Sequence, residues 1–185
     1  MTNKKFTLAE QLRTGHVKRW QIVRVAREQT IAEHMYRVNR IALHIAHKFD
    51  LTPADLDLIS EWALIHDMPE VITGDIATPT KMAMRKAVPD SDPIKHIELE
   101  LDVNYHYLYQ LCKTQHPVVL AIVKLADLIE AVDFLKVEAL GTHAKSVQLK
   151  LQESFFDAIK VYWEEWPEHN WQSVVDTYME LIFDR

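Results

Sequence analysis

Glycine is scarce in this chain of 185 residues, where Gly15, Gly74 and Gly141 are the only three. A phosphate-binding P-loop and a dinucleotide-binding fingerprint both need closely spaced glycines, because the backbone must approach the phosphates closely. Neither motif can be built from three glycines so far apart. If the protein handles phosphates, it must therefore use side chains or a metal ion.

Cysteine and long apolar segments are also nearly absent. Cys112 is the only cysteine, which excludes an internal disulfide and any cysteine-rich zinc or iron–sulfur site. No apolar run reaches the ~18 residues of a membrane span. The first residues, MTNKKF, are not followed by the apolar segment of a secretory signal. These features predict a cytoplasmic protein with no membrane partner.

The charge and hydrophobicity of the chain are those of an ordinary globular protein. It has 27 acidic and 21 basic residues, a net charge of −6 and 48% hydrophobic residues. The acidic balance disfavours binding to a nucleic-acid duplex, which needs a basic surface. A chain of this length can bury one substantial core, so we expect a single domain over residues 1–185. Ten histidines are the unusual feature, since histidine is a common metal ligand.

Helix signals dominate the sequence and predict an all-α bundle of about six to eight helices. Capping boxes, in which a threonine accepts a backbone hydrogen bond and a glutamate reaches back, are expected at Thr7–Glu10 and Thr30–Glu33. An amphipathic helix follows Thr30, and a helix that is apolar almost all round begins near Pro117. We expect further helices from Pro53 to about Asp67, from about Asp92 through Leu108, and over residues 144–165 and 170–184, with an irregular segment over 70–93.

Asp127 is a charged residue inside the most apolar of these helices. Burying a lone carboxylate costs several kcal/mol, so Asp127 must be paired or must bind a metal. An ion pair with Lys124 or with an arginine, and a role as metal ligand, both remain open on the residues alone.

His66 and Asp67 form a second feature, close to the end of a predicted helix. Neighbours on a helix point about 100° apart, but they can contact one ion where the helix ends, and Pro69 indicates that it ends here. Nitrogen and oxygen donors together favour zinc, manganese, cobalt or iron over calcium. For the doublet alone, a side-chain hydrogen bond at the helix end is the alternative.

The order of these residues, with His34 before His66-Asp67 and Asp127 after them, resembles the HD-domain phosphohydrolases. Arg19-Trp20 and the segment His66–Lys81 extend the resemblance to the bacterial HD-domain 5′-deoxynucleotidases. The similarity covers residues 13–135, and the compact chain is most similar to the phage dATP triphosphohydrolases. The C-terminal helices over residues 144–185 carry no family motif.

This resemblance implies a metal-dependent hydrolase that converts dATP and water to deoxyadenosine and triphosphate. The alternatives are a deoxynucleoside 5′-monophosphatase and a nucleotide-binding regulator without turnover. Zinc is the expected metal, and cobalt, manganese and iron are the alternatives. A second divalent ion such as magnesium would lie near Glu70. We expect a small deoxynucleotide substrate, a homo-oligomer, and a location in the host cytoplasm if a phage encodes the chain.

The resemblance also implies roles for individual residues. The metal ligands would be His34, His66, Asp67 and Asp127. The catalytic residues would be Glu70 as general acid or base and Asp75 at the sugar 3′-hydroxyl or the leaving oxygen. The substrate would contact Arg19 and Lys81 through phosphates, Trp20 and Ile22 through the base, and Thr78 and Pro79. On the residues alone, a solvated carboxylate after a helix end is the favoured explanation for Glu70. A surface charge is the alternative for Arg19, and a core tryptophan is the alternative for Trp20.

Overall fold

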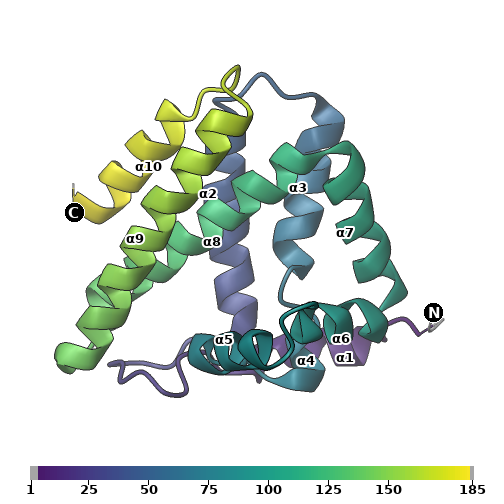
Figure 1. The fold of residues 1–185 in the computed structure, drawn as a ribbon, viewed down its shortest axis with the longest axis vertical. Coiled ribbons are helices and arrows are strands. Elements are labelled where there is room, and N and C mark those ends of the chain that lie inside the picture. Colours follow the sequence, from purple (N-terminus) through teal and green to yellow (C-terminus); the bar gives the residue numbers. More distant parts are fainter. Residues whose placement is uncertain (1–3, 184–185) are drawn as a thin grey trace.

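The computed structural model describes residues 4–183, and over them the protein is a bundle of helices (Figure 1). β-Pairing among these residues is confined to two isolated bridges, Lys18 with Thr30 and Val25 with Ala139. The all-α prediction is therefore confirmed. The elements are α1 (Leu8–Leu12), the 3₁₀ turn η1 (Arg13–Gly15), α2 (Ile31–Ala46), α3 (Pro53–Ile65), α4 (Glu70–Thr73), α5 (Thr78–Ala87), α6 (Pro93–Leu101), α7 (Val103–Gln115), α8 (Pro117–Glu138), α9 (Gly141–Glu165) and α10 (Gln172–Phe183).

The nearly all-apolar helix, α8, is the centre of the bundle. Helices α2, α3, α7, α9 and α10 all pack against it (Figure 1). Its buried side chains run from Val119 to Leu135 and lie on every face of the helix, as the sequence predicts. Eight of the helices in the described part of the chain have nine or more residues. None of the described helices is long and apolar enough to span a membrane.

The two predicted capping boxes differ in the structure. Thr7 and Glu10 form the complete box. Thr30 accepts the hydrogen bond from the Glu33 backbone N–H, but the Glu33 carboxylate turns instead to the Arg27 guanidinium, with distances of 2.7 and 2.9 Å. The second box is therefore only half formed, because a two-point hydrogen bond to a guanidinium is the stronger interaction for the carboxylate.

The expectation of an irregular segment over residues 70–93 is wrong. The segment contains α4 and the ten-residue helix α5. Gly74, at φ 71°, ends α4 in the left-handed region that a glycine adopts without strain. Pro79 lies in the first turn of α5, where no N–H partner is needed, so this proline starts a helix instead of preventing one.

The expectation of one continuous helix from Asp92 through Leu108 is also wrong. Asp102 is in an extended conformation and divides the segment into α6 and α7. Its carboxylate caps α7 by accepting from the Tyr105 backbone N–H at 2.8 Å, and it also accepts from the Phe6 backbone N–H at 2.5 Å. An aspartate that hydrogen-bonds backbone in this way favours a helix start over a helix interior.

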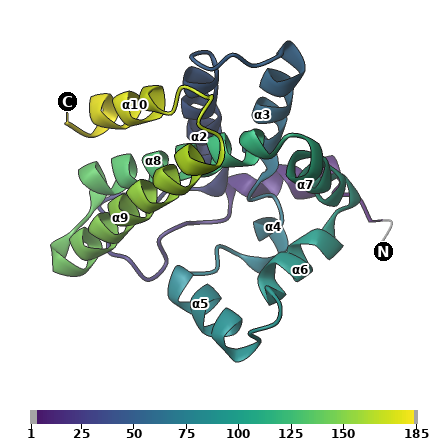
Figure 2. The ribbon, with the colours of Figure 1, turned by 45° about the horizontal axis from the view of Figure 1, so that its top comes forward.

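The helices are arranged so that α4, α5 and α6 form a group to one side of α8 and α9 (Figure 2). The segment between η1 and α2 lies against the C-terminal end of α8, where Val25 forms a bridge with Ala139. This arrangement brings residues from the first, middle and last thirds of the chain around the N-terminal half of α2.

Candidate active site

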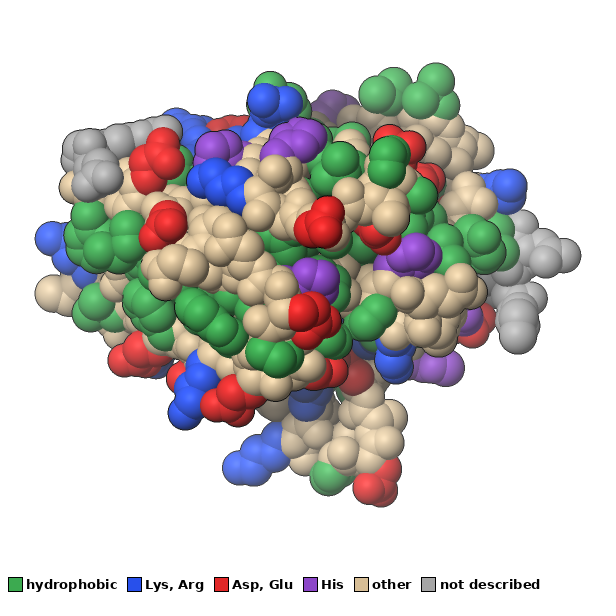
Figure 3. Space-filling model, turned by 90° about the horizontal axis from the view of Figure 1, so that it is seen from above, with side chains coloured by type: hydrophobic (Ala, Val, Ile, Leu, Met, Phe, Trp, Pro, Cys, Tyr) green, Lys and Arg blue, Asp and Glu red, His purple; other side chains and the backbone are tan. Residues whose placement is uncertain are grey.

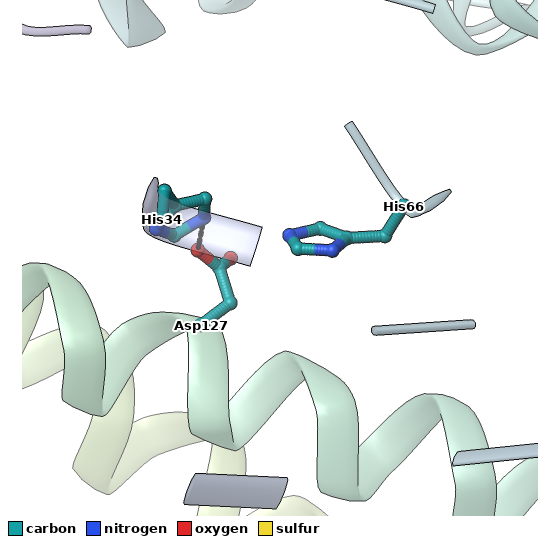
Figure 4. A group of neighbouring side chains, drawn as sticks. All are labelled: His34, His66 and Asp127. Atoms are coloured by element: carbon teal, nitrogen blue, oxygen red, sulfur yellow. Dashed lines mark ion pairs between the residues drawn. The ribbon is translucent and has the colours of Figure 1, made fainter. Parts of the chain in front are cut away.

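Three helices bring the candidate metal ligands to one point. His34 lies in the first turn of α2, His66 directly follows α3, and Asp127 lies in the middle of α8. One nitrogen or oxygen atom from each lies within 4.8 Å of the others. Figure 4 shows the His66 ring directed towards the pair formed by His34 and Asp127. The structure thus assembles three of the four residues into a group that could hold a metal ion.

Asp67 joins the same group. Its Oδ2 lies 3.5 Å from His34 Nε2 and 3.6 Å from His66 Nε2. His66 is the C-cap of α3 and Asp67 lies in the turn that follows, and both side chains approach His34.

Asp127 makes both of the interactions left open by the sequence. Its Oδ1 lies 3.3 Å from His34 Nε2, and its Oδ2 lies 2.8 Å from Lys124 Nζ. Burial opposes ionisation of this carboxyl, but Lys124 and His34 hold its pKa well below the usual value. Asp127 is therefore ionised at neutral pH and can serve as an anionic ligand while it is paired.

The histidine nitrogens provide the test of whether these residues fit a metal. His34 Nδ1 lies 2.6 Å from Glu130 Oε2, and His66 Nδ1 lies 2.8 Å from the Ala63 carbonyl oxygen. Both Nε2 atoms are buried without a hydrogen-bond partner. When each Nδ1 carries the hydrogen, two Nε2 lone pairs and two carboxylates converge, an arrangement that favours a bound cation. Two nitrogens and two carboxylate oxygens fit a transition metal such as zinc.

A cleft of about 680 Å³ opens beside this group. It is lined by every other residue singled out from the sequence: Arg19, Trp20, Ile22, Glu70, Asp75, Thr78, Pro79 and Lys81. Of the four ligand candidates, His66, Asp67 and Asp127 line it, while His34 is completely buried behind them. The cleft therefore joins the metal group to the candidate substrate residues.

Glu70 is buried, with 4% of its surface exposed, so it is not a solvated carboxylate. Its Oε2 has no hydrogen-bond partner, and its Oε1 lies 3.4 Å from Lys81 Nζ. Burial, followed by the charges of Asp67 and Asp75, raises the pKa of Glu70 to about 9. In the absence of a metal, Glu70 is thus a protonated acid at neutral pH on the wall of the cleft.

Trp20 and Arg19 form one wall of the cleft. Among residues 4–183, Trp20 alone of the non-glycine residues has a positive φ, 64°, a conformation that costs roughly 1–2 kcal/mol. Its ring stacks on Phe134 at 5.8 Å, and the Arg19 guanidinium lies 5.1 Å from its centroid. The ring is therefore a packing group and a cleft wall at once. Ile22, by contrast, is 55% exposed.

Sequence reasoning missed several residues of the site. Glu130 is fully buried against His34, although the argument applied to Asp127 holds equally for a second carboxylate one turn further along α8. The cleft is also lined by four residues to which the sequence gave no substrate role: Arg85, Lys95, Lys124 and His143. Val147, Leu151 and Tyr162 of α9 also line it, so the C-terminal region without a family motif still contributes to the cleft.

Comparisons with known proteins agree with this geometry. A family model described as HD domain matches residues 9–96. The chain is 31% identical to a dATP triphosphohydrolase of Acinetobacter phage SH-Ab 15497, over 96% of this chain and 92% of that protein. It is 35% identical to a dATP triphosphohydrolase of Cyanophage S-2L, over 78% of each chain.

A solved structure has the same fold. It is described as the Cyanophage S-2L HD phosphohydrolase (DatZ) bound to dA and one catalytic Zn²⁺ ion. It matches with a TM-score of 0.81 and 28% identity, over 98% of this chain and 100% of that chain. An all-helical fold with a histidine–aspartate metal group defines an HD-domain hydrolase. The chain belongs to the HD-domain phosphohydrolase family that includes the phage dATP triphosphohydrolases.

Proposed function

We propose that this protein is a dATP triphosphohydrolase, which converts dATP and water to deoxyadenosine and triphosphate. The observation that carries the proposal is the convergence of two buried, unpartnered Nε2 atoms and two aspartates beside a cleft of about 680 Å³. Relatives that bear this activity in their names, over nearly the whole chain, support the choice of substrate.

The ion would be zinc, held by His34, His66, Asp67 and Asp127. One ion there supplies polarisation of a phosphoryl oxygen and a lowered pKa for water, both of which assist attack on phosphorus. The four residues come from α2, α8 and the end of α3, so the fold fixes them before an ion binds.

Glu70 would act as the general acid of the reaction. Burial raises the pKa of its carboxyl, which favours the protonated form, and the proton can pass to the 5′-oxygen as the bond to the α-phosphorus breaks. Arg19 and Lys81 would bind phosphate oxygens, and Lys124 adds a third cation on the same cleft. Asp75, also on the cleft wall, would accept the sugar 3′-hydroxyl.

Base selection would depend on Trp20 and Ile22, with Thr78 and Pro79 completing the substrate contacts. Trp20 would stack on adenine, and the apolar edge of Ile22 would face the purine. Guanine and 2-aminoadenine carry a 2-amino group that an apolar wall leaves without a hydrogen bond, at a cost of ~1–3 kcal/mol. That range corresponds to roughly 5–150-fold in kcat/KM in favour of dATP.

The decisive experiment is chromatographic identification of the products formed from dATP by the zinc-loaded protein. We expect deoxyadenosine and tripolyphosphate in equal amounts. Faster release of orthophosphate from dAMP would favour the monophosphatase, and binding of dATP without turnover would favour a regulator.

A second experiment tests base selection. Ile22→Ala should narrow the difference in kcat/KM between dATP and dGTP. Equal rates on both nucleotides in the unmutated protein would contradict the base-edge argument and leave the hydrolase proposal intact.

Four further expectations from the sequence remain predictions. They are a homo-oligomeric state, a cytoplasmic location, a second divalent ion such as magnesium near Glu70, and a single HD domain spanning the whole of residues 1–185. Size-exclusion chromatography with light scattering measures the first, and metal titration after zinc loading measures the third.

A further inference from the structure

Glu130 is a buried carboxylate that the proposed reaction does not use. It lies on α8 one turn beyond Asp127, has no exposed surface, and is not part of the cleft lining. A buried charge is costly unless opposite charges and hydrogen bonds offset the loss of water, so the contacts of Glu130 indicate what it does.

Both oxygens of Glu130 are held by donors on two sides. Oε2 lies 2.6 Å from His34 Nδ1 and 3.3 Å from an Arg19 nitrogen. Oε1 accepts from Gln29 Nε2 at 2.7 Å and lies 2.8 Å from Arg37 Nε. Four groups thus fix the plane of the carboxylate, and His34 is the one group among them that belongs to the metal site.

The contact with His34 sets the position of the ring hydrogen. Two guanidinium groups, those of Arg19 and Arg37, and the amide of Gln29 also face Glu130, so the carboxylate acts only as an acceptor. A 2.6 Å contact with such a group indicates a hydrogen on His34 Nδ1, although the Arg19 guanidinium also lies against this nitrogen. The Nε2 lone pair is then directed towards Asp67 and Asp127.

Gln29 continues the network to the cleft wall. It is fully buried, donates to Glu130 through Nε2, and accepts from Trp20 Nε1 at 2.8 Å through Oε1. The indole that lines the cleft and the histidine of the metal group are therefore anchored by the same carboxylate.

We propose that Glu130 is a positioning residue, which holds His34 in the Nδ1–H form so that Nε2 faces the metal. The inference rests on the proposed metal site. Carboxylates placed behind metal-binding histidines fix ring orientation and raise ligand basicity, and their loss typically lowers metal affinity by about 10–100-fold.

Glu130→Gln tests this with little change of shape. An amide has one acceptor oxygen, but both edges of Glu130 face donors, so the amide NH₂ must meet either His34 and Arg19 or Gln29 and Arg37. The matched control is Asp133→Asn. Asp133 is a buried carboxylate on the same helix that pairs with Arg37 at 2.5 Å, and Arg37, rather than His34, links it to Glu130.

Two measurements decide the proposal, and neither uses a nucleotide. Zinc affinity by competition titration should fall about 10–100-fold in Glu130→Gln and stay within about twofold of the unmutated protein in Asp133→Asn. Nitrogen-15 NMR of the zinc-loaded, unmutated protein should show His34 protonated at Nδ1.

Unchanged zinc affinity in Glu130→Gln, or an equal loss in Asp133→Asn, would overturn the positioning role. If Glu130→Gln does not fold, the NMR measurement decides alone, because a hydrogen on His34 Nε2 excludes the proposal. A protein that binds zinc as described but leaves dATP intact would contradict the proposed function and not this inference.

Discussion

Glu70 shows at the scale of one residue how burial changes chemistry. On the sequence it is a carboxylate just after a proline, and solvent exposure would be the ordinary expectation. In the structure it is buried between Asp67 and Lys81, with one oxygen unpartnered. A general acid needs its proton at the working pH, and this environment retains it.

Glu70→Gln should preserve the fold and the zinc content but lower kcat by ~10²–10⁴-fold, the usual contribution of general acid or base catalysis. Steady-state rates on dATP, with zinc measured on the same sample, provide the test. An unchanged kcat would remove Glu70 from the mechanism, and loss of zinc would make it a metal ligand.

The pKa of Glu70 also predicts a pH dependence of stability. Its folded pKa of about 9 is above the usual value, so its contribution to stability is fully present below about pH 4.5 and is lost as pH rises through about 9. We therefore compare the free energy of unfolding of metal-free Glu70→Gln with that of the unmutated chain. The difference should grow in favour of Glu70→Gln from pH 5 to pH 9, by a few kcal/mol in all at about 1.4 kcal/mol per pKa unit. Urea denaturation at several pH values measures it, and a difference independent of pH would contradict it.

The residues that sequence predicts best are those with both a chemical type and a fixed order along the chain. His34, His66, Asp67 and Asp127 meet in the structure as that order predicts. Glu130 was missed because its role depends on which side of α8 faces α2, and the uniformly apolar pattern of α8 gives no such side. The left-handed φ of Trp20 has no sequence signal, since the residue is not glycine or asparagine.

At the scale of elements, Asp102 decides where two helices meet. Its carboxylate satisfies the Tyr105 N–H at the start of α7 and the Phe6 N–H of the N-terminal segment, and 5% of Asp102 is exposed. The hydrophobic pattern runs unbroken through this point, which is why periodicity predicts a single helix and the structure has two.

Asp102→Ala should lower the free energy of unfolding by roughly 2–4 kcal/mol, from a lost helix cap of ~1 kcal/mol and a buried N–H left without a partner at ~1–3 kcal/mol. Urea denaturation with Asp92→Ala as the control is the measurement. Asp92 caps α6 in the same way, and its other partner is the exposed Arg85 guanidinium instead of a buried backbone N–H, so its loss should cost about 1 kcal/mol. Equal losses would mean that the contact with Phe6 adds nothing.

For the whole molecule, the metal group connects helices that are far apart in the sequence. His34 and Asp127 belong to α2 and α8, and α3 places His66 between them. Charges elsewhere are dispersed: Figure 3 shows acidic, basic and histidine side chains interspersed with hydrophobic ones over the face it displays. Because the metal ligands come from several helices, a bound ion would stabilise the entire bundle.

Zinc at about 100 times its dissociation constant should stabilise the folded chain by ~2.7 kcal/mol, which raises the Tm by roughly 5–11 °C for a protein of this size. A chelator should reverse the shift. Thermal unfolding of His66→Ala is the control, since the eight histidines outside the metal group offer other places for zinc. The same shift in His66→Ala would show that the stabilising ion binds elsewhere.

The spacing of the acidic residues on α8 has a consequence for changes of chain length. Asp127, Glu130 and Asp133 follow one another at intervals of three residues on a single helix. A substitution changes one of them, whereas a change in the length of the helix moves all three. Deleting a single residue of α8 before Asp127 would rotate all three by about 100° relative to the N-terminal part of the helix. Asp127 would leave the metal group and Glu130 would leave His34 in the same event. Insertions and deletions should therefore be far more harmful in this helix than in the loops around the cleft.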